Sequence, residues 1–227
     1  MNSRIYYHLL SSRNAIHDLE RRMIRVSLLG TLNDPFELMP YLRYRDADKR
    51  KRIKLIRRSF SGKYGLLCFS GTWTEPLLWG HYADKHKGVA LGFELLHDQI
   101  IEVEYTSSPV RKQIEVATDS EDNEKLFFDL AKIKYHKWEY ENEYRILVAL
   151  KDCMEFDGQR FLRFDERLKI KEIILGCNYD NSLGYIVGLA RQLGAEVIPT
   201  RMEWQGYRIK RCGRKTKEVQ QMLVSIE

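Results

Sequence analysis

Cysteine is scarce in this sequence of 227 residues, and its placement argues against several classes of protein. The four cysteines, Cys68, Cys153, Cys177 and Cys212, lie far apart and form no CxxC motif and no cluster with histidine. A disulfide framework or a zinc site needs closely patterned cysteines. The sequence therefore favours reduced thiols in a cytoplasmic protein and disfavours a zinc site.

Long apolar segments are also missing. The uncharged apolar runs are far shorter than the roughly 20 residues that cross a bilayer. The N-terminus, MNSRIYYHLL, contains no apolar run followed by a small-residue cleavage site, so no secretion signal is predicted. Internal repeats, low-complexity blocks and linkers are absent from the sequence as well. We therefore expect a single cytoplasmic domain over residues 1–227, without membrane contact.

Charge, in contrast, is abundant and unevenly placed, with a formal net charge of +6. Nine lysines or arginines lie between Arg43 and Arg58, and six lie between Arg208 and Lys217 without any acid. Such runs suit a phosphate backbone, although a solvated helix face and a basic tail are the more common explanation. Few aromatic residues lie among them, so sequence-specific readout is not supported. The candidate residues for binding a nucleic acid or nucleotide in the first run are Lys49, Arg50, Arg52, Lys54 and Arg57.

The segment from Trp138 to Leu150, WEYENEYRILVAL, combines acids with strand-forming residues. Read as one strand, it presents Glu139, Glu141, Glu143 and Arg145 on one face. Stacked carboxylates repel each other and raise the proton affinity of at least one acid, so such a face needs solvent, a cation or a ligand. A solvated strand with Arg145 as counter-ion is an equally good interpretation.

Two other segments carry polar residues with a simple structural account. In the run Asn33 to Glu37, Asp34 can cap a helix, Pro35 can be its first residue, and Glu37 can complete a capping box. The segment from Glu75 to His86 has helical spacing, and its aromatic stripe is typical of core residues. Its two histidines are five residues apart and do not share the helix face that a two-histidine metal site needs.

The remaining pattern indicates an α+β fold. Asp157 and Gly158 between two strand-like runs predict a hairpin. The strand Ile170–Leu175, a helix over about residues 182–193 and the strand Ala195–Pro199 predict a right-handed parallel crossover. We therefore expect one domain with a mixed, mostly antiparallel sheet flanked by helices.

Four motifs resemble those of a known family. LNDPFE at Leu32–Glu37, LLWGHYADKHKGVALGF at Leu77–Phe93, WEYENEYRIL at Trp138–Leu147 and IKEIILG at Ile170–Gly176 resemble the bacterial domain of unknown function 2971 in order and spacing. Some members of that family are described as abortive-infection or phage-resistance proteins. The resemblance implies that the loop, the helix and the acidic segment form one site.

The order of the elements also resembles the layout of ADP-ribosyltransferases, which use NAD. In that superfamily an Arg or His on the first strand holds the ribose, a Ser or Tyr shapes the nicotinamide pocket, and a late Glu stabilises the transition state. The resemblance implies these roles for the following residues: Tyr7 or His8, Ser70 or Tyr82, and Glu143 with Glu141 as its partner.

Three functions stay open. The first is a phage-defence or toxin-type effector that transfers ADP-ribose from NAD or cleaves NAD, with Arg145 keeping Glu143 ionised and Trp79 or Tyr82 stacking on nicotinamide. The second is a magnesium-dependent nuclease whose ligands are Asp34, Glu37, Glu141 and Glu143. The third is a non-catalytic nucleic-acid-binding module whose acids are buried in ion pairs.

The family resemblance leads to one geometric expectation. We predict a cleft between the acidic segment and the helix Leu77–His86. Glu141, Glu143 and Arg145 should face the Asn33–Glu37 loop and His81 or Tyr82 across it. His81 is then a catalytic candidate, and Asn33 is a substrate-binding candidate.

Overall fold

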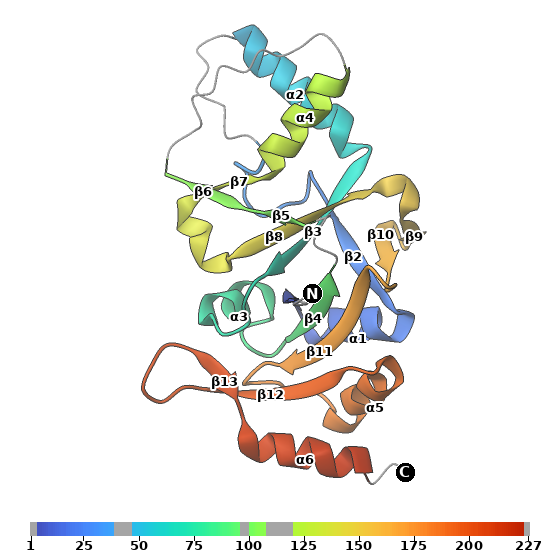
Figure 1. Ribbon diagram of the computed structural model, residues 1–227, viewed down its shortest axis with the longest axis vertical. Coiled ribbons are helices and arrows are strands. Elements are labelled where there is room, and N and C mark those ends of the chain that lie inside the picture. The colour runs from blue at the N-terminus through green and yellow to red at the C-terminus, as the bar shows by residue number, and fades with distance from the viewer. Residues whose placement is uncertain (1–3, 39–46, 96–99, 108–119, 225–227) are drawn as a thin grey trace.

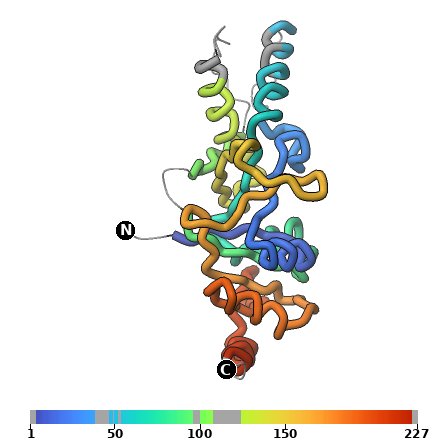
Figure 2. The backbone as a smooth tube through the Cα atoms, turned by 90° about the vertical axis from the view of Figure 1, so that its right-hand side faces the viewer, coloured from blue at the N-terminus to red at the C-terminus, as the bar shows by residue number. Residues whose placement is uncertain are grey.

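The computed structural model describes residues 4–38, 47–95, 100–107 and 120–224 (Figures 1 and 2). Its α-helices are α1 (Ser12–Arg21), α2 (Ala47–Ser61), α3 (Pro76–Tyr82), α4 (Ser120–Ala131), α5 (Leu183–Leu193) and α6 (Gly213–Val224). Two 3-10 helices are η2 (His136–Glu141) and η3 (Leu150–Asp152). None of the helices in these ranges is long and apolar enough to span a membrane.

The strands form one large sheet and one small one. The strands of the large sheet are β1 (Ile5–Leu10), β2 (Met23–Leu28), β3 (Tyr64–Ser70), β4 (Val89–Leu95), β5 (Ile101–Glu102), β8 (Glu143–Ala149), β9 (Met154–Phe156), β10 (Gln159–Arg163), β11 (Leu168–Leu175), β12 (Glu196–Met202) and β13 (Ile209–Arg211). The small sheet pairs β6 (Glu104–Thr106) with β7 (Ile133–Tyr135) in parallel.

The large sheet has eleven strands and runs through most of the described chain. Its main order is β13-β12-β11-β4-β1-β3-β2-β10-β9, and β8 lies beside β3 with β5 on its other edge. Only β11 and β12 pair in parallel within it, and α5 connects them. The expected mixed, mostly antiparallel sheet flanked by helices is therefore confirmed.

Local sequence signals account for several of these elements. The Ser182 side chain caps α5 by accepting from the Tyr185 N–H at 3.4 Å, and Gly194 ends the helix with φ +66°. Asp157 and Gly158 have φ of 50° and 69°, which is the geometry of a two-residue hairpin turn. That turn joins β9 to β10, so the predicted hairpin is confirmed.

Helices cover the sheet in separate groups. The main apolar core lies between the sheet and α1, α5 and α6, and a second one lies beneath α2 and α4, where Phe60 stacks on Phe127 at 4.7 Å between ring centroids. Figure 1 shows α2 and α4 at one end of an elongated molecule and α6 at the other, and Figure 2 shows the same separation from the side. The described part of the first basic run, on α2, and the basic residues of α6 therefore lie at opposite ends.

Two glycines let backbone segments approach each other closely near α3. The Gly176 N–H donates to the Gly88 carbonyl at 3.0 Å, and a Cβ atom on Gly176 would overlap the carbonyl oxygen of His86. A Cβ on Gly88 would likewise overlap the carbonyl of Leu10. Backbone atoms cannot move aside cheaply, so both positions require glycine.

We expect Gly176→Ala to lower the free energy of unfolding by ~1–3 kcal/mol because of this overlap. Gly188→Ala is the matched control, because Gly188 lies inside α5 with no atom within 4 Å of an added Cβ. That change should stabilise the protein by up to ~1 kcal/mol through helix propensity. Urea unfolding of the three proteins measures both effects, and equal midpoints would contradict the close approach.

Candidate functional site

The acidic segment is not the single strand that its alternating pattern predicts. Residues 136–141 form the 3-10 helix η2, Asn142 adopts a left-handed conformation with φ 43°, and β8 begins only at Glu143. Asn tolerates this backbone region better than most residues, and it turns the chain between the two elements. Glu139 is exposed as a result, while Glu141 and Glu143 reach the interior from different elements.

Five charged side chains meet in the interior, and we call Glu37, Lys134, Glu141, Glu143 and Arg145 the buried ion network. Its centre is the pair of Glu143 and Arg145 on β8. The Arg145 Nε donates to Glu143 Oε1 at 2.8 Å, and its Nη2 donates to Oε2 at 2.9 Å. Lys134 on β7 also donates to Oε2 at 2.8 Å. Both oxygens of Glu143 are therefore engaged by cations of the chain itself.

The two cations also bind the other acids of the network. Arg145 Nη2 donates to Glu37 Oε1 at 2.7 Å, and its Nη1 donates to the Ala131 carbonyl at the end of α4 at 2.9 Å. Lys134 Nζ lies 3.4 Å from Glu37 Oε1 and forms a close ion pair with Glu141. The network thus joins β8, β7, η2, the end of α4 and the loop that carries Glu37.

The structure corrects the capping-box interpretation of the Asn33–Glu37 loop. Asp34 does act locally, since its Oδ1 accepts from the Phe36 N–H at 2.8 Å. Glu37 does not reach back to complete a capping box, because Arg145 and Lys134 bind its carboxylate. Asp34 therefore does not join the other acids. In the part of the chain that the structure describes, no group of three or more His, Cys, Asp or Glu side chains is arranged to hold a metal ion.

Polar side chains extend the network toward the surface. The Tyr82 hydroxyl donates to Glu141 Oε1 at 2.5 Å, and the Asn33 amide donates to the Tyr82 hydroxyl at 2.9 Å. The expected contact of the acidic segment with the Asn33–Glu37 loop and with Tyr82 is therefore present. Tyr82 on α3 bonds directly to Glu141 on η2, so the two elements are in contact at this point. The open hollow of about 480 Å³ described along β8 is lined by none of the network residues.

The pKa values of Glu141 and Glu143, which the sequence suggests as a pair, shift in opposite directions. Burial favours the neutral form of Glu143, but the charges of Arg145 and Lys134 outweigh it and lower its pKa to about 2. Burial raises the pKa of Glu141, where Lys134 opposes the shift and the charge of Glu143 adds to it. Burial also opposes the charged form of Lys134, but the carboxylates around it raise its pKa.

The other predicted residues of the α3 region lie outside the network. His81 is exposed and stacks on Tyr140 of η2, with 6.1 Å between ring centroids. Trp79 is fully buried, and its indole N–H donates to the Trp73 carbonyl at 2.7 Å, so it is a core residue. Neither side chain contacts an acid of the network.

Three residues from the ADP-ribosyltransferase resemblance share one row of the sheet. Tyr7 on β1 pairs with Ser70 on β3, and Ser70 pairs with Glu143 on β8. Directly paired residues point to the same face of a sheet. The Tyr7 hydroxyl donates to Glu172 at 3.0 Å, and Ser70 Oγ accepts from the Thr72 N–H at 3.2 Å. His8 points to the opposite face, where its Nδ1 lies 2.8 Å from the Cys68 carbonyl oxygen, and burial lowers its pKa.

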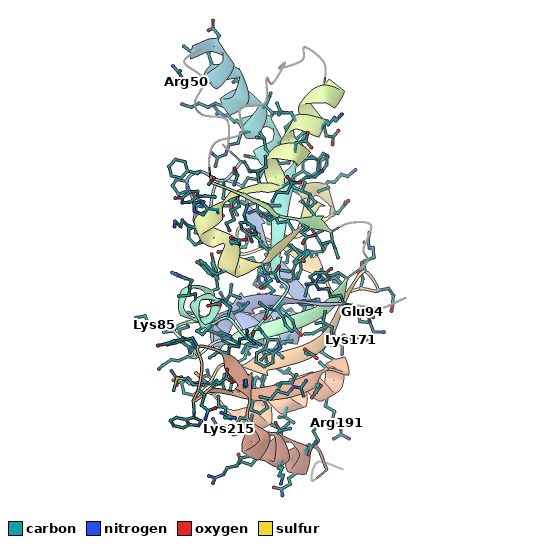
Figure 3. All side chains as sticks on the ribbon, turned by 60° about the vertical axis from the view of Figure 1, so that its left-hand side comes forward. Arg50, Lys85, Glu94, Lys171, Arg191 and Lys215 are labelled. Atoms are coloured by element: carbon teal, nitrogen blue, oxygen red, sulfur yellow. The ribbon has the colours of Figure 1, made fainter. Side chains whose placement is uncertain are left out.

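The basic candidates of the first run lie on α2. Lys54 is exposed, and Arg57 is half-buried with its Nη2 donating to the Leu29 carbonyl at 3.5 Å. The side chains of Lys49 and Arg52, together with the run before residue 47, lie outside the described residues. Figure 3 places Arg50 near one end of the molecule and Lys215 of the second run near the other. The two runs cannot form one continuous surface.

Sequence reasoning missed two residues that complete the site. Lys134 neutralises three acids, and the Tyr105 hydroxyl accepts from the Glu143 N–H at 2.8 Å. Lys134 lies in IKY, between a helix and the acidic segment, with no motif around it. The available signal was electrostatic, because three buried acids with a single arginine leave too little positive charge.

Comparison with known proteins supports the family resemblance over part of the chain. Residues 78–146 match the family model described as Protein of unknown function (DUF2971). No curated protein and no solved structure matches the chain. The matched range contains Tyr82, Lys134, Glu141, Glu143 and Arg145, so four of the five network residues lie within it.

We expect Glu143→Gln to lower the free energy of unfolding at pH 7 by about 3–5 kcal/mol, because it leaves Arg145 and Lys134 undercompensated in the interior. Glu139→Gln is the matched control, since Glu139 is exposed in the same segment. Its effect should stay within about 0.5 kcal/mol. Urea unfolding measures both variants.

The same variants test the pKa of Glu143. A pKa lowered from 4.5 to about 2 means that the folded state favours the ionised form. The stabilising contribution is therefore complete above about pH 4.5 and is lost as the pH falls toward 2. Wild type should lose more stability in this range than Glu143→Gln, and parallel curves would contradict the assignment.

Proposed function

We propose that the protein is a nucleic-acid-binding module without catalysis at its acidic site. In this proposal the buried ion network stabilises the fold, and the basic surfaces bind phosphate groups. The observation that carries the proposal is that both carboxylate oxygens of Glu143 are already bound by Arg145 and Lys134. A carboxylate with both oxygens bound in this way has little hydrogen-bonding capacity left for a substrate.

The chemistry of the competing functions supports this choice. A transferase needs its glutamate beside the bond that breaks, and a magnesium site needs free carboxylate oxygens. The side chain of Glu143 is 5% exposed and that of Glu37 is 3% exposed, and Lys134 stands among the acids. Lys134 and Arg145 occupy the positions next to the carboxylate of Glu143 that a substrate or cation would need.

The network is well placed to support a binding surface. It fixes the end of α4 through the Ala131 carbonyl, and α4 packs against α2 through the stacked rings of Phe60 and Phe127. The exposed side chains of α2 include Lys51, Lys54 and Arg58. A fixed helix holds these cations in place, where they raise the local concentration of a polyanion.

We expect wild-type protein to bind nucleic acid with an affinity that falls steeply with salt, because phosphate binding releases counterions. Fluorescence anisotropy with labelled single-stranded and double-stranded oligonucleotides at several salt concentrations measures the slope. Lys54→Glu combined with Arg58→Glu should weaken binding to the α2 surface and reduce the slope, while Lys169→Glu on β11 is an exposed control. Glu143→Gln, measured where it remains folded, should bind like wild type.

Absence of salt-dependent binding to any oligonucleotide would contradict the proposal. The same samples test the nuclease alternative when Mg²⁺ is added. Cleavage that requires Mg²⁺ and that is lost in Glu141→Gln would support a nuclease and overturn the non-catalytic proposal.

A second candidate function is NAD-dependent ADP-ribosyl transfer or NAD cleavage. The row of Tyr7, Ser70 and Glu143 across three adjacent strands favours it, since it brings one candidate for each of the three roles that the resemblance implies to one face of the sheet. NAD would then be the substrate, and Ser70 would contact the nicotinamide end. A phage-defence or toxin-type role, which the family resemblance implies, fits this activity.

The second candidate predicts release of nicotinamide from NAD by wild-type protein. Ser70→Ala removes a hydroxyl without removing a charge from the network, and we expect at least a tenfold loss of the release rate, in the range of one lost transition-state contact. Ser59→Ala on the exposed face of α2 is the control. If wild type releases no nicotinamide and modifies no protein, DNA or RNA, this candidate fails while the binding proposal stands.

A further inference from the structure

We infer that the loop between β12 and β13 is a binding site for single-stranded nucleic acid, with bases stacking on Trp204 and Tyr207. We call residues 202–208 the hairpin tip. Trp204 is 92% exposed, Tyr207 is 97% exposed and Met202 is 65% exposed. This inference rests on the proposed nucleic-acid binding and assigns it a site and a class of ligand.

The hairpin that carries these side chains is firmly held at its base. Arg201 pairs with Lys210 and Met202 pairs with Ile209 across β12 and β13. Ile209 is buried beside Trp79, and its N–H donates to the Thr74 carbonyl at 2.9 Å. The Glu203 N–H donates to the Arg208 carbonyl at 2.9 Å within the tip. The aromatic rings are therefore presented to solvent by an ordered backbone.

The surroundings of the tip are strongly basic. Between residues 201 and 217 the chain has seven lysines or arginines and one acid, Glu203, which pairs with Lys210. Arg208 in the tip is exposed, as are Arg214 and Lys215 at the start of α6. Figure 1 shows the hairpin projecting from the body of the molecule with α6 beside it, and Figure 3 labels Lys215 at this end. Exposed aromatics and cations thus occur together.

This combination favours a single strand over other polyanions. Cations alone would bind any phosphate backbone. Exposed aromatic rings add affinity only by stacking on planar groups whose faces are accessible. Bases of a single strand present such faces, whereas those of a duplex are covered by their neighbours. Charge complementarity and the two rings therefore point to the same ligand.

The test measures binding of full-length protein to an unstructured oligothymidine and to a duplex of equal length by fluorescence anisotropy. Trp204→Ala and Tyr207→Ala should each weaken binding of the single strand about 5- to 150-fold, which is the range of one lost stacking contact. Trp204→Phe should retain most of the affinity, because it keeps an aromatic face. Phe156→Ala is the control, since Phe156 is 46% exposed on β9, at the opposite edge of the sheet.

The outcomes separate this inference from the proposed function. Wild-type affinity in both alanine variants, or equal losses for single strand and duplex, would overturn the hairpin site and leave nucleic-acid binding in place. Failure of wild type to bind any oligonucleotide would overturn both. Binding of polyglutamate but not oligothymidine, lost in the same variants, would assign the tip to an acidic protein partner and overturn the inference. Thermal unfolding of each variant checks that the fold is retained.

Discussion

The two hydrogen bonds between Arg145 and Glu143 are the interaction on which the packing of β7, β8, η2 and the end of α4 depends. Removing a charge from water costs several kcal/mol, and only close partners offset that cost. Arg145 is 1% exposed, yet its donors all find acceptors, on Glu143, Glu37 and the Ala131 carbonyl. These bonds offset the cost of burying the charged side chains of Glu37, Glu143 and Arg145 together, and among the described residues the Glu37 Oε2 atom has no hydrogen-bond partner.

The network also helps to fix the position of β8 between two of the three apolar clusters of the described chain. The main core lies on the face of β8 that carries Tyr144 and Val148, and the core beneath α2 and α4 lies on the face that carries Arg145. Alternation along a strand assigns neighbouring residues to opposite faces. A one-residue slip of β8 against β3 would place Arg145 in the apolar core and Tyr144 among the acids. The charged residues therefore fix the register of β8 against β3.

Local signals in the sequence were sufficient for much of the fold. The parallel unit of β11, α5 and β12 follows from apolar periodicity and Gly194, and the hairpin follows from Asp157 and Gly158. The acidic segment was predicted wrongly because its residue types alternate in the sequence, although residues 136–141 form a 3-10 helix, which has three residues per turn. Lys134 and the exposed rings of Trp204 and Tyr207 depend on long-range placement, which no local pattern encodes. The motif resemblance did bring the loop and Arg145 together, but the chemistry of that site stays a prediction.

The sharing of donors within the network has a consequence for how this protein can evolve. Lys134 forms ion pairs with three carboxylates and Arg145 with two, so each carboxylate shares its cation with at least one other carboxylate. The effect of replacing one residue then depends on which others are still present, and the free-energy changes are not additive. Loss of one of the five leaves an uncompensated buried charge, whereas removal of a cation together with its carboxylates does not. Selection for stability would therefore favour changing these residues together over changing them one at a time.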